Sequence, residues 1–129
     1  YDAVGRVASI PGIVNAVQYS ADGQVLRQEN ANGTVTTRSY DPAMGWLTSE
    51  RTVSGTAVVQ DRSYARNADG QLASVTSPFA GESWDYTYDA RHRLASATHV
   101  GAPADDQAFV YDTLGRLTFN SQLGQYTYG

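Results

Sequence analysis

The chain has 129 residues, of which 41% are hydrophobic and 17% charged, with a formal net charge of −4 and no cysteine. This composition is typical of a globular domain, and the negative charge argues against binding to nucleic acid or to an anionic membrane surface, since both need basic patches. The lack of cysteine excludes disulfides, zinc–thiolate sites and thiol nucleophiles, and no apolar run approaches the roughly 20 residues that span a bilayer.

A short motif of the form Asp-x-x-Gly-Arg-aliphatic recurs from the first residues to the last. Its fourth position recurs at intervals of 18 to 25 residues, which indicates a repeat architecture. Asp or Asn can bond its own backbone two residues on, and Gly takes positive φ without steric cost, so each copy predicts a type I turn closed by a left-handed residue. The predicted turn residues are Asp2, Gly5, Gly23, Asp41, Gly45, Asn67, Gly70, Asp89, His92, Asp112 and Gly115.

Some copies depart from this pattern. Ser20 replaces the acid of the second copy, and the third copy carries one extra residue around Pro42. His92 stands where Gly is expected; because His is enriched at positive φ, we expect that turn to survive with some strain.

Strands are predicted on both sides of each turn. Residues two apart share a face of a strand, and the incoming segments place long side chains there, as in Tyr86 and Tyr88 or Phe109 and Tyr111. Each outgoing segment starts with a branched aliphatic residue: Val7, Val25, Leu47, Leu72, Leu94 or Leu117. Second connections are expected at 11–12, 30–33, 54–55, 78–81, 101–104 and 123–124, and Asn32-Gly33 is typical of a two-residue hairpin loop.

No window has a sustained helical period, and Gly or Pro interrupts every candidate helix. The sequence therefore predicts an all-β fold of tandem antiparallel hairpins that form one continuous curved sheet. Residues 1–129 are expected to be a single array of about six repeats of about 22 residues each, and a fragment of a longer repeat domain.

The segments at 86–94 and 109–117, with Tyr88-Asp89 and Tyr111-Asp112 at their centres, resemble the YD repeat of the Rhs family. This family includes the shell components of insecticidal Tc toxins and, more distantly, the teneurins, and the resemblance covers essentially the whole chain. It implies a hollow shell built from a spiralling sheet of hairpins, which in bacterial members encloses a C-terminal toxin domain. Asp41-Pro42 matches the family's self-cleavage motif only superficially and fits an ordinary turn with one inserted residue.

The resemblance implies a non-enzymatic wall segment of a secreted or cell-surface bacterial protein. Its partners would be the remaining repeats, an enclosed toxin domain and delivery machinery, with no nucleic acid and no membrane insertion by this segment. The alternative is an extracellular adhesion or carbohydrate-binding module of teneurin or wall-associated type. Its candidate stacking platform for sugars is the set of aromatic rows Trp84/Tyr86/Tyr88, Phe109/Tyr111 and Tyr126/Tyr128, and loss of glycan binding on changing Trp84 would support it.

The repeated aromatic and basic residues favour packing over ligand binding. The aromatic rows are expected to form a cross-strand ladder of aromatic pairs, and each repeat Arg is expected to pair with carboxylates or turn carbonyls of a neighbouring unit, not with phosphate. The predicted packing residues are Tyr19, Tyr40, Tyr64, Tyr88, Tyr111, Arg6, Arg93 and Arg116.

No catalytic, cofactor-binding or metal-binding residue is predicted. Asp105-Asp106, with Asp112 nearby, lacks the organised oxygen ligands that calcium requires and is interpreted as a solvated loop. His92 and His99 are assigned structural roles, because no nucleophile elbow accompanies them. The sequon at Asn32 lies in a tight turn and is expected to be unmodified.

Overall fold

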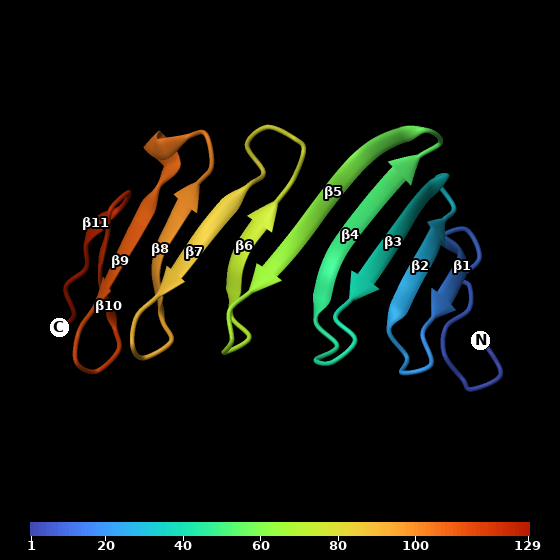
Figure 1. Cartoon of the computed structure of the whole chain (residues 1–129), viewed down its shortest axis with the longest axis horizontal. Coiled ribbons are helices and arrows are strands. Elements are labelled where there is room, and N and C mark those ends of the chain that lie inside the picture. The colour runs from blue at the N-terminus through green and yellow to red at the C-terminus, as the bar shows by residue number, and fades with distance from the viewer. The chain divides into compact units, whose positions relative to one another are not determined.

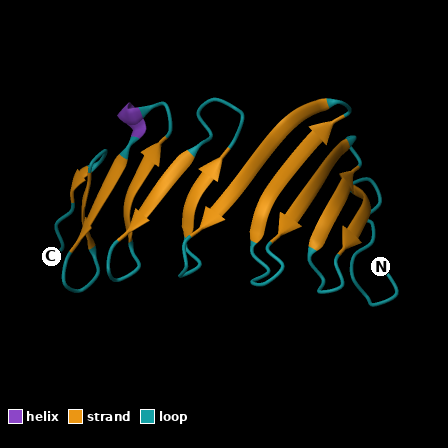
Figure 2. Cartoon of the chain, viewed as in Figure 1, coloured by secondary structure: helices purple, strands orange, loops and turns teal.

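The computed structural model describes residues 1–129 and divides them into two compact units, Tyr1–Ser63 and Tyr64–Gly129. Both units consist of β-strands joined by turns (Figures 1 and 2), so the predicted all-β fold of tandem antiparallel hairpins is confirmed. A single array over the whole chain remains a prediction. The structure contains no helix of the length and apolar character needed to cross a bilayer.

The first unit pairs each strand with the next one along the chain. Its strands are β1 (Val14–Tyr19), β2 (Val25–Asn30), β3 (Thr34–Tyr40), β4 (Leu47–Ser54) and β5 (Ala57–Arg66), the last of which continues into the second unit. The pairs β1–β2, β2–β3, β3–β4 and β4–β5 are all antiparallel. The Gly-centred turns all lie at the same ends of the strands, and the variable connections lie at the opposite ends (Figure 1).

The second unit follows the same scheme. It contains β6 (Leu72–Thr76), β7 (Trp84–Tyr88), β8 (Leu94–His99), the 3-10 helix η1 (Pro103–Asp105), β9 (Gln107–Tyr111), β10 (Leu117–Asn120) and β11 (Gly124–Gln125). Successive strands from β6 to β11 pair antiparallel. In this unit too, the Gly-centred turns lie at the same ends of the strands (Figure 1).

The strand register shifts beside the Gly-centred turns. Tyr19 pairs with Val25, Tyr40 with Leu47 and Tyr88 with Leu94, each after a shift of register along its hairpin. A type I turn followed by a residue in the left-handed region produces such a bulge, because the extra residue stays unpaired. The repeat Tyr is thereby placed directly across from the aliphatic residue that follows its own turn.

Three details of the sequence prediction were wrong. Asn32-Gly33 is not a two-residue loop: the connection also includes Ala31, and Gly33 N donates to Asn30 O at 3.1 Å. The connection after β8 contains η1, which was not foreseen and which begins at Pro103, where a fixed φ and a missing N–H are tolerated. The strand expected after Val7 is reduced to an isolated bridge between Ile10 and Val14.

Neither unit encloses a hydrophobic core. Val14 and Ala97 are the buried hydrophobic residues, with 8% and 6% of their surface exposed, and the buried polar residues are Thr36, His99 and Asn120. Most other strand residues are half-buried. The sheets must therefore be stabilised by contacts between consecutive hairpins, and the residues at the repeat turns supply many of these contacts.

Candidate functional site: the interlocked repeat turns

The Asp-x-x-Gly-Arg turns share one backbone geometry. In the turn that starts at Asp89, Asp89 N donates to Arg93 O at 2.9 Å and His92 N donates to Asp89 O at 2.9 Å. Oδ1 of Asp89 accepts the backbone N–H groups of Arg91 and Arg93 at 2.8 and 3.0 Å. The turns at Asp2 and Asp112 repeat these contacts. An acid at the first position thus satisfies two backbone donors that the strands leave unpaired.

The residue at the Gly position of the turn adopts the left-handed region in every copy. Gly5 has φ of 82° and Gly115 of 87°, whereas His92, the non-Gly residue with positive φ, has φ of 61°. Its ring Nδ1 lies 3.7 Å from Oδ2 of Asp69, and both side chains are largely exposed. The turn survives the substitution, as expected, at the steric cost that a Cβ carries in this region.

Three copies add an ion pair and a ring contact, which together we call the Asp–Arg–Tyr brace. In each brace Oδ2 of the turn Asp accepts Nε of the turn Arg at 2.7 Å, and the guanidinium lies over the ring of the next repeat's Tyr. The distances from Cζ to the ring centroid are 4.4, 4.4 and 4.7 Å, which suit a cation–π contact. The braces are Asp2–Arg6–Tyr19, Asp89–Arg93–Tyr111 and Asp112–Arg116–Tyr128.

Of the two partners expected for each Arg in a neighbouring unit, Arg6 and Arg93 contact a turn carbonyl, and no brace Arg contacts a neighbouring carboxylate. The carboxylate belongs to the Arg's own turn, because four residues around a tight turn bring the two side chains together. The contact with the neighbour goes instead to the Tyr ring and to a carbonyl: Nη1 of Arg6 donates to Ser20 O at 3.2 Å and Nη1 of Arg93 donates to Asp112 O at 3.4 Å.

The brace lowers the pKa of its carboxyl group. The side-chain hydrogen bond from Arg93, followed by the backbone hydrogen bond from the same residue, lowers the pKa of Asp89 to about 2. Side-chain and backbone hydrogen bonds from Arg116 lower the pKa of Asp112, and hydrogen bonds led by the Arg6 backbone lower that of Asp2. Each acid is therefore held in the charged form that the brace requires.

Five repeat Tyr residues connect their own hairpin to the preceding one. Their hydroxyl groups donate to the carbonyl of the aliphatic residue that follows the previous turn, over distances of 2.7 to 3.0 Å. The pairs are Tyr19 with Val7, Tyr40 with Val25, Tyr88 with Leu72, Tyr111 with Leu94 and Tyr128 with Leu117. One Tyr thus contacts the previous repeat through its hydroxyl and, in the braces, accepts a guanidinium on its ring.

Two turns replace the charged pair by a neutral one. Ser20 and Gln24 stand in the Asp and Arg positions of one turn, and Asn67 and Gln71 in those of another. Asn67 Nδ2 donates to Gln71 Oε1 at 3.0 Å, and both Gln side chains reach the next turn: Gln24 Nε2 donates to Gly45 O at 2.8 Å and Gln71 Nε2 to His92 O at 2.9 Å. Arg occurs with Asp, and Gln with Ser or Asn, so these positions vary together.

The sequence prediction omitted three residues of this hydrogen-bond network and included one residue that does not lie at the repeat Tyr position. Gln24, Gln71 and Tyr128 were not among the predicted packing residues, although their positions relative to the turn Gly would have identified them. Tyr64 lies two residues before the repeat Tyr position, where Arg66 stands, and it is half-buried.

The aromatic rows do not form the predicted ladder of aromatic pairs. Tyr86 lies across from Ala97 and Tyr88 from Leu94, so each ring faces a small or aliphatic neighbour. Trp84 lies across from His99, and the two rings stack with centroids 4.4 Å apart at an angle of 4°. One face of Trp84 is therefore covered, which weakens its case as a sugar platform.

His99 has a structural setting at the end of β8. Its Nδ1 lies 2.8 Å from Oδ2 of Asp105, and its backbone N donates to Oδ1 of Asp106 at 2.8 Å. The two acids, predicted to form a solvated loop, therefore hold the connection that contains η1 against the strand. The structure contains no group of three or more His, Asp or Glu residues that could hold a metal ion.

Comparison with known proteins assigns the repeats to a family. The RHS repeat model matches residues 19–57 and 66–104, and the chain belongs to this family, as the sequence predicted. Two similar proteins are toxin subunits of Yersinia entomophaga: YenC1 is 34% identical over 101 residues and YenC2 33% identical over 103 residues. The aligned parts cover 66% and 67% of this chain but 10% of each subunit, so the chain spans about a tenth of these relatives.

Solved structures of toxin complexes contain the same fold. The Tc holotoxin pore of Photorhabdus luminescens matches with a TM-score of 0.71 and 25% identity, over 95% of this chain and 7% of that one. A complex of TcdB2 with TccC3 that lacks the hypervariable C-terminal region matches with a TM-score of 0.73 and 25% identity, over 95% of this chain and 8% of that one.

Proposed function

We propose that this chain is a wall segment of an Rhs-type toxin shell, which encloses a C-terminal toxin domain and helps to deliver it. The observation that carries this proposal is the linkage of consecutive hairpins at the repeat turns in sheets that lack an enclosed core. Such sheets gain stability by adding neighbours, as repeat proteins do, and can be extended into a wall. The toxin subunits among the relatives support this use of the fold.

In this role the chain separates the enclosed toxin domain from its surroundings and does not catalyse a reaction. The acids and arginines of the three braces pair with one another, and the repeat Tyr hydroxyl groups bond backbone carbonyls, so these repeated polar groups stabilise the wall itself. The partners would be further repeats of the same polypeptide, the enclosed domain and the delivery machinery. We place the whole protein outside the bacterial cell after secretion.

Protease protection in the intact protein tests this proposal. A region enclosed by the wall should resist trypsin in the wild type and become cleavable when the braces are weakened by replacing Arg6, Arg93 and Arg116 together with Ala. The matched control removes the same charge from Arg27, Arg51 and Arg62, which lie on β2, β4 and β5 and outside the repeat turns. Equally fast cleavage of the C-terminal region in the wild-type protein and in a protein without the repeats would refute enclosure.

A further inference from the structure

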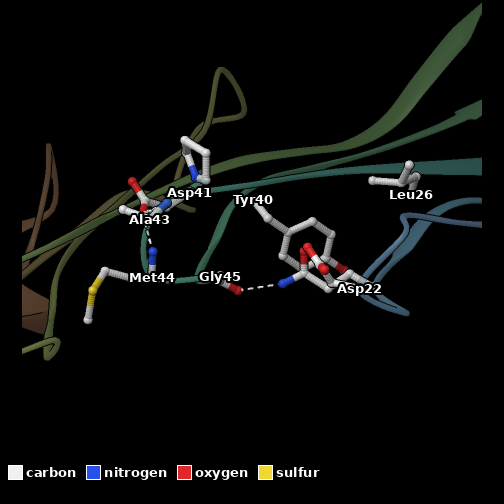
Figure 3. Close-up of a pocket in the computed structure, with 9 residues that line it drawn as sticks. Asp22, Leu26, Tyr40, Asp41, Ala43, Met44 and Gly45 are labelled. Carbon is white, nitrogen blue, oxygen red and sulfur yellow. Dashed lines mark hydrogen bonds between the residues drawn. The ribbon is translucent and has the colours of Figure 1, made fainter.

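A pocket of about 450 Å³ lies in the first unit, beside the turns at Ser20 and Asp41 (Figure 3). Residues of β2, of the end of β3 and of both turns line it, and all of them belong to Tyr1–Ser63. The lining residues are Asp22, Gln24, Leu26, Tyr40, Asp41, Pro42, Ala43, Met44 and Gly45.

The pocket is a consequence of two adjacent departures from the repeat. Gln24 replaces Arg, and its amide reaches across to Gly45 O (Figure 3). The turn at Asp41 contains one extra residue, so Gly45 N donates to Asp41 O over four residues, whereas Gly5 N donates to Asp2 O over three. A shorter side chain on one side and a wider turn on the other leave space between them.

Tyr40 is a brace tyrosine without its guanidinium. Its hydroxyl donates to Val25 O at 3.0 Å, as the hydroxyl groups of the braced Tyr residues do for their own neighbours. In the braces a guanidinium of the chain lies 4.4 to 4.7 Å from the ring centroid, but the corresponding residue here is the neutral Gln24. The ring of Tyr40 lines the pocket instead.

Asp41 is a brace aspartate without its guanidinium. Its Oδ1 accepts the backbone N–H groups two and three residues on, Ala43 and Met44, at 3.0 and 2.7 Å, whereas in the braces Oδ1 accepts those two and four residues on. In the braces Oδ2 accepts Nε of an Arg, but the position after Gly45 is held by Trp46. The ion pairs of the structure involve neither Asp41 nor Asp22, the second carboxylate of the pocket.

We propose that this pocket binds the arginine side chain of a partner polypeptide. Two groups that each lack an Arg line the same cavity: the Tyr40 ring, from the junction where Gln24 stands, and the Asp41 carboxylate, from the turn where Trp46 stands. A guanidinium entering it can stack on the ring and donate two parallel hydrogen bonds to a carboxylate, which an ammonium group cannot do in the same plane. Leu26 and Met44, which are 39% and 59% exposed, offer apolar surface to the aliphatic stem.

Binding of labelled peptides to the intact protein tests the proposal by fluorescence anisotropy. The probe is a short Gly-Ser peptide with one central arginine, compared with the same peptide carrying citrulline or lysine. We expect the citrulline peptide, which keeps the shape but lacks the charge, to bind about tenfold more weakly, and the lysine peptide to bind more weakly than arginine.

Three variants locate the binding. Gln24→Arg should abolish it, because the chain's own guanidinium then lies over Tyr40, whereas Gln71→Arg makes the same change in the second unit and should leave binding unchanged. Asp22→Asn should weaken binding about threefold or more by removing one carboxylate. Since the Asp22 side chain takes no part in the turn hydrogen bonds, that variant remains decisive if Gln24→Arg fails to fold.

The proposal is overturned if citrulline or lysine binds as tightly as arginine, or if Gln24→Arg and Asp22→Asn both bind the arginine peptide as the wild type does. The inference does not depend on the role of the chain in a shell, because the readout is peptide binding and not protection of a toxin domain.

Discussion

Removing one hydroxyl group from the second unit tests how the hairpins are linked. Tyr88→Phe keeps the ring and deletes only the donor to Leu72 O, a hydrogen bond of 2.8 Å in partly buried surroundings. Tyr86→Phe is the matched control. Tyr86 lies two residues before Tyr88 on β7. Burial, and to a smaller extent the neighbouring Tyr88, raises the pKa of the Tyr86 hydroxyl group, which is partly desolvated. The Tyr86 hydroxyl forms no hydrogen bond in the structure.

The expected size of the effect follows from the exposure of the bond. A net intramolecular hydrogen bond contributes about 0.5–1.5 kcal/mol. Because the site is only partly buried, water can take the place of the lost donor at Leu72 O, so we expect about 1 kcal/mol. Local opening of the β6–β7 pair would then become roughly fivefold more frequent.

Hydrogen exchange followed by mass spectrometry on the intact protein measures this local opening. Amides of β6 and β7 should exchange roughly fivefold faster in Tyr88→Phe than in the wild type, while those of β9 and β10 keep their rates. The control Tyr86→Phe should exchange at the wild-type rate, since it removes no hydrogen bond within the protein and no buried unsatisfied donor. Equal acceleration by both substitutions would refute a specific role for the Tyr88 hydroxyl.

The remaining predictions concern the turns. The brace lowers the pKa of Asp89 from 3.8 to about 2, so the contribution of the Asp89 carboxylate to stability is complete above pH 3.8 and is lost as the pH falls through about 2. Hydrogen exchange in β7 and β8 should therefore accelerate as the pH falls from 3.8 to about 2, and should accelerate less in Asp89→Asn. His92→Gly should slow exchange in the same hairpin by relieving the left-handed strain, a gain of about 0.5–1 kcal/mol after the entropy cost of Gly. Ser20→Asp combined with Gln24→Arg should create a fourth brace. A double-mutant cycle of these two substitutions, measured by hydrogen exchange in β1 and β2, should give a coupling free energy of about 0.5 kcal/mol. Zero coupling would contradict the brace geometry.

The fold followed from the sequence because the turn chemistry and the strand period pointed to the same hairpins. Asp89 and Gly115, for example, have side-chain and backbone requirements that only a tight turn satisfies at that spacing. The short helix η1 was missed because Pro103 is compatible with a loop or a 3-10 turn, and only the packing against β8 separates the two.

The brace was only half predictable. The spacing of the repeat placed Arg93 near acidic and aromatic residues. Because the motif recurs in every repeat, the spacing alone does not say whether the acid that pairs with Arg93 lies in the same turn or in the next one. The four-residue separation of Asp89 and Arg93 resolves this only once the turn is known to bring residues one and five together. The ring contact with Tyr111 also needed the strand register, which the bulge beside the turn shifts.

The coupling between repeats is local and directional, and this bears on how such a sheet tolerates the loss of a single contact. Tyr111 donates its hydroxyl to the hairpin before it and receives a guanidinium from the same turn region, so one side chain holds two consecutive hairpins together. Without a shared core, loss of one such residue weakens the pairing of its own neighbours and leaves distant hairpins with their contacts intact. A sheet stabilised this way can lengthen by adding copies without redesigning an interior, and the neutral turns at Ser20 and Asn67 show that an individual junction tolerates the loss of its ion pair.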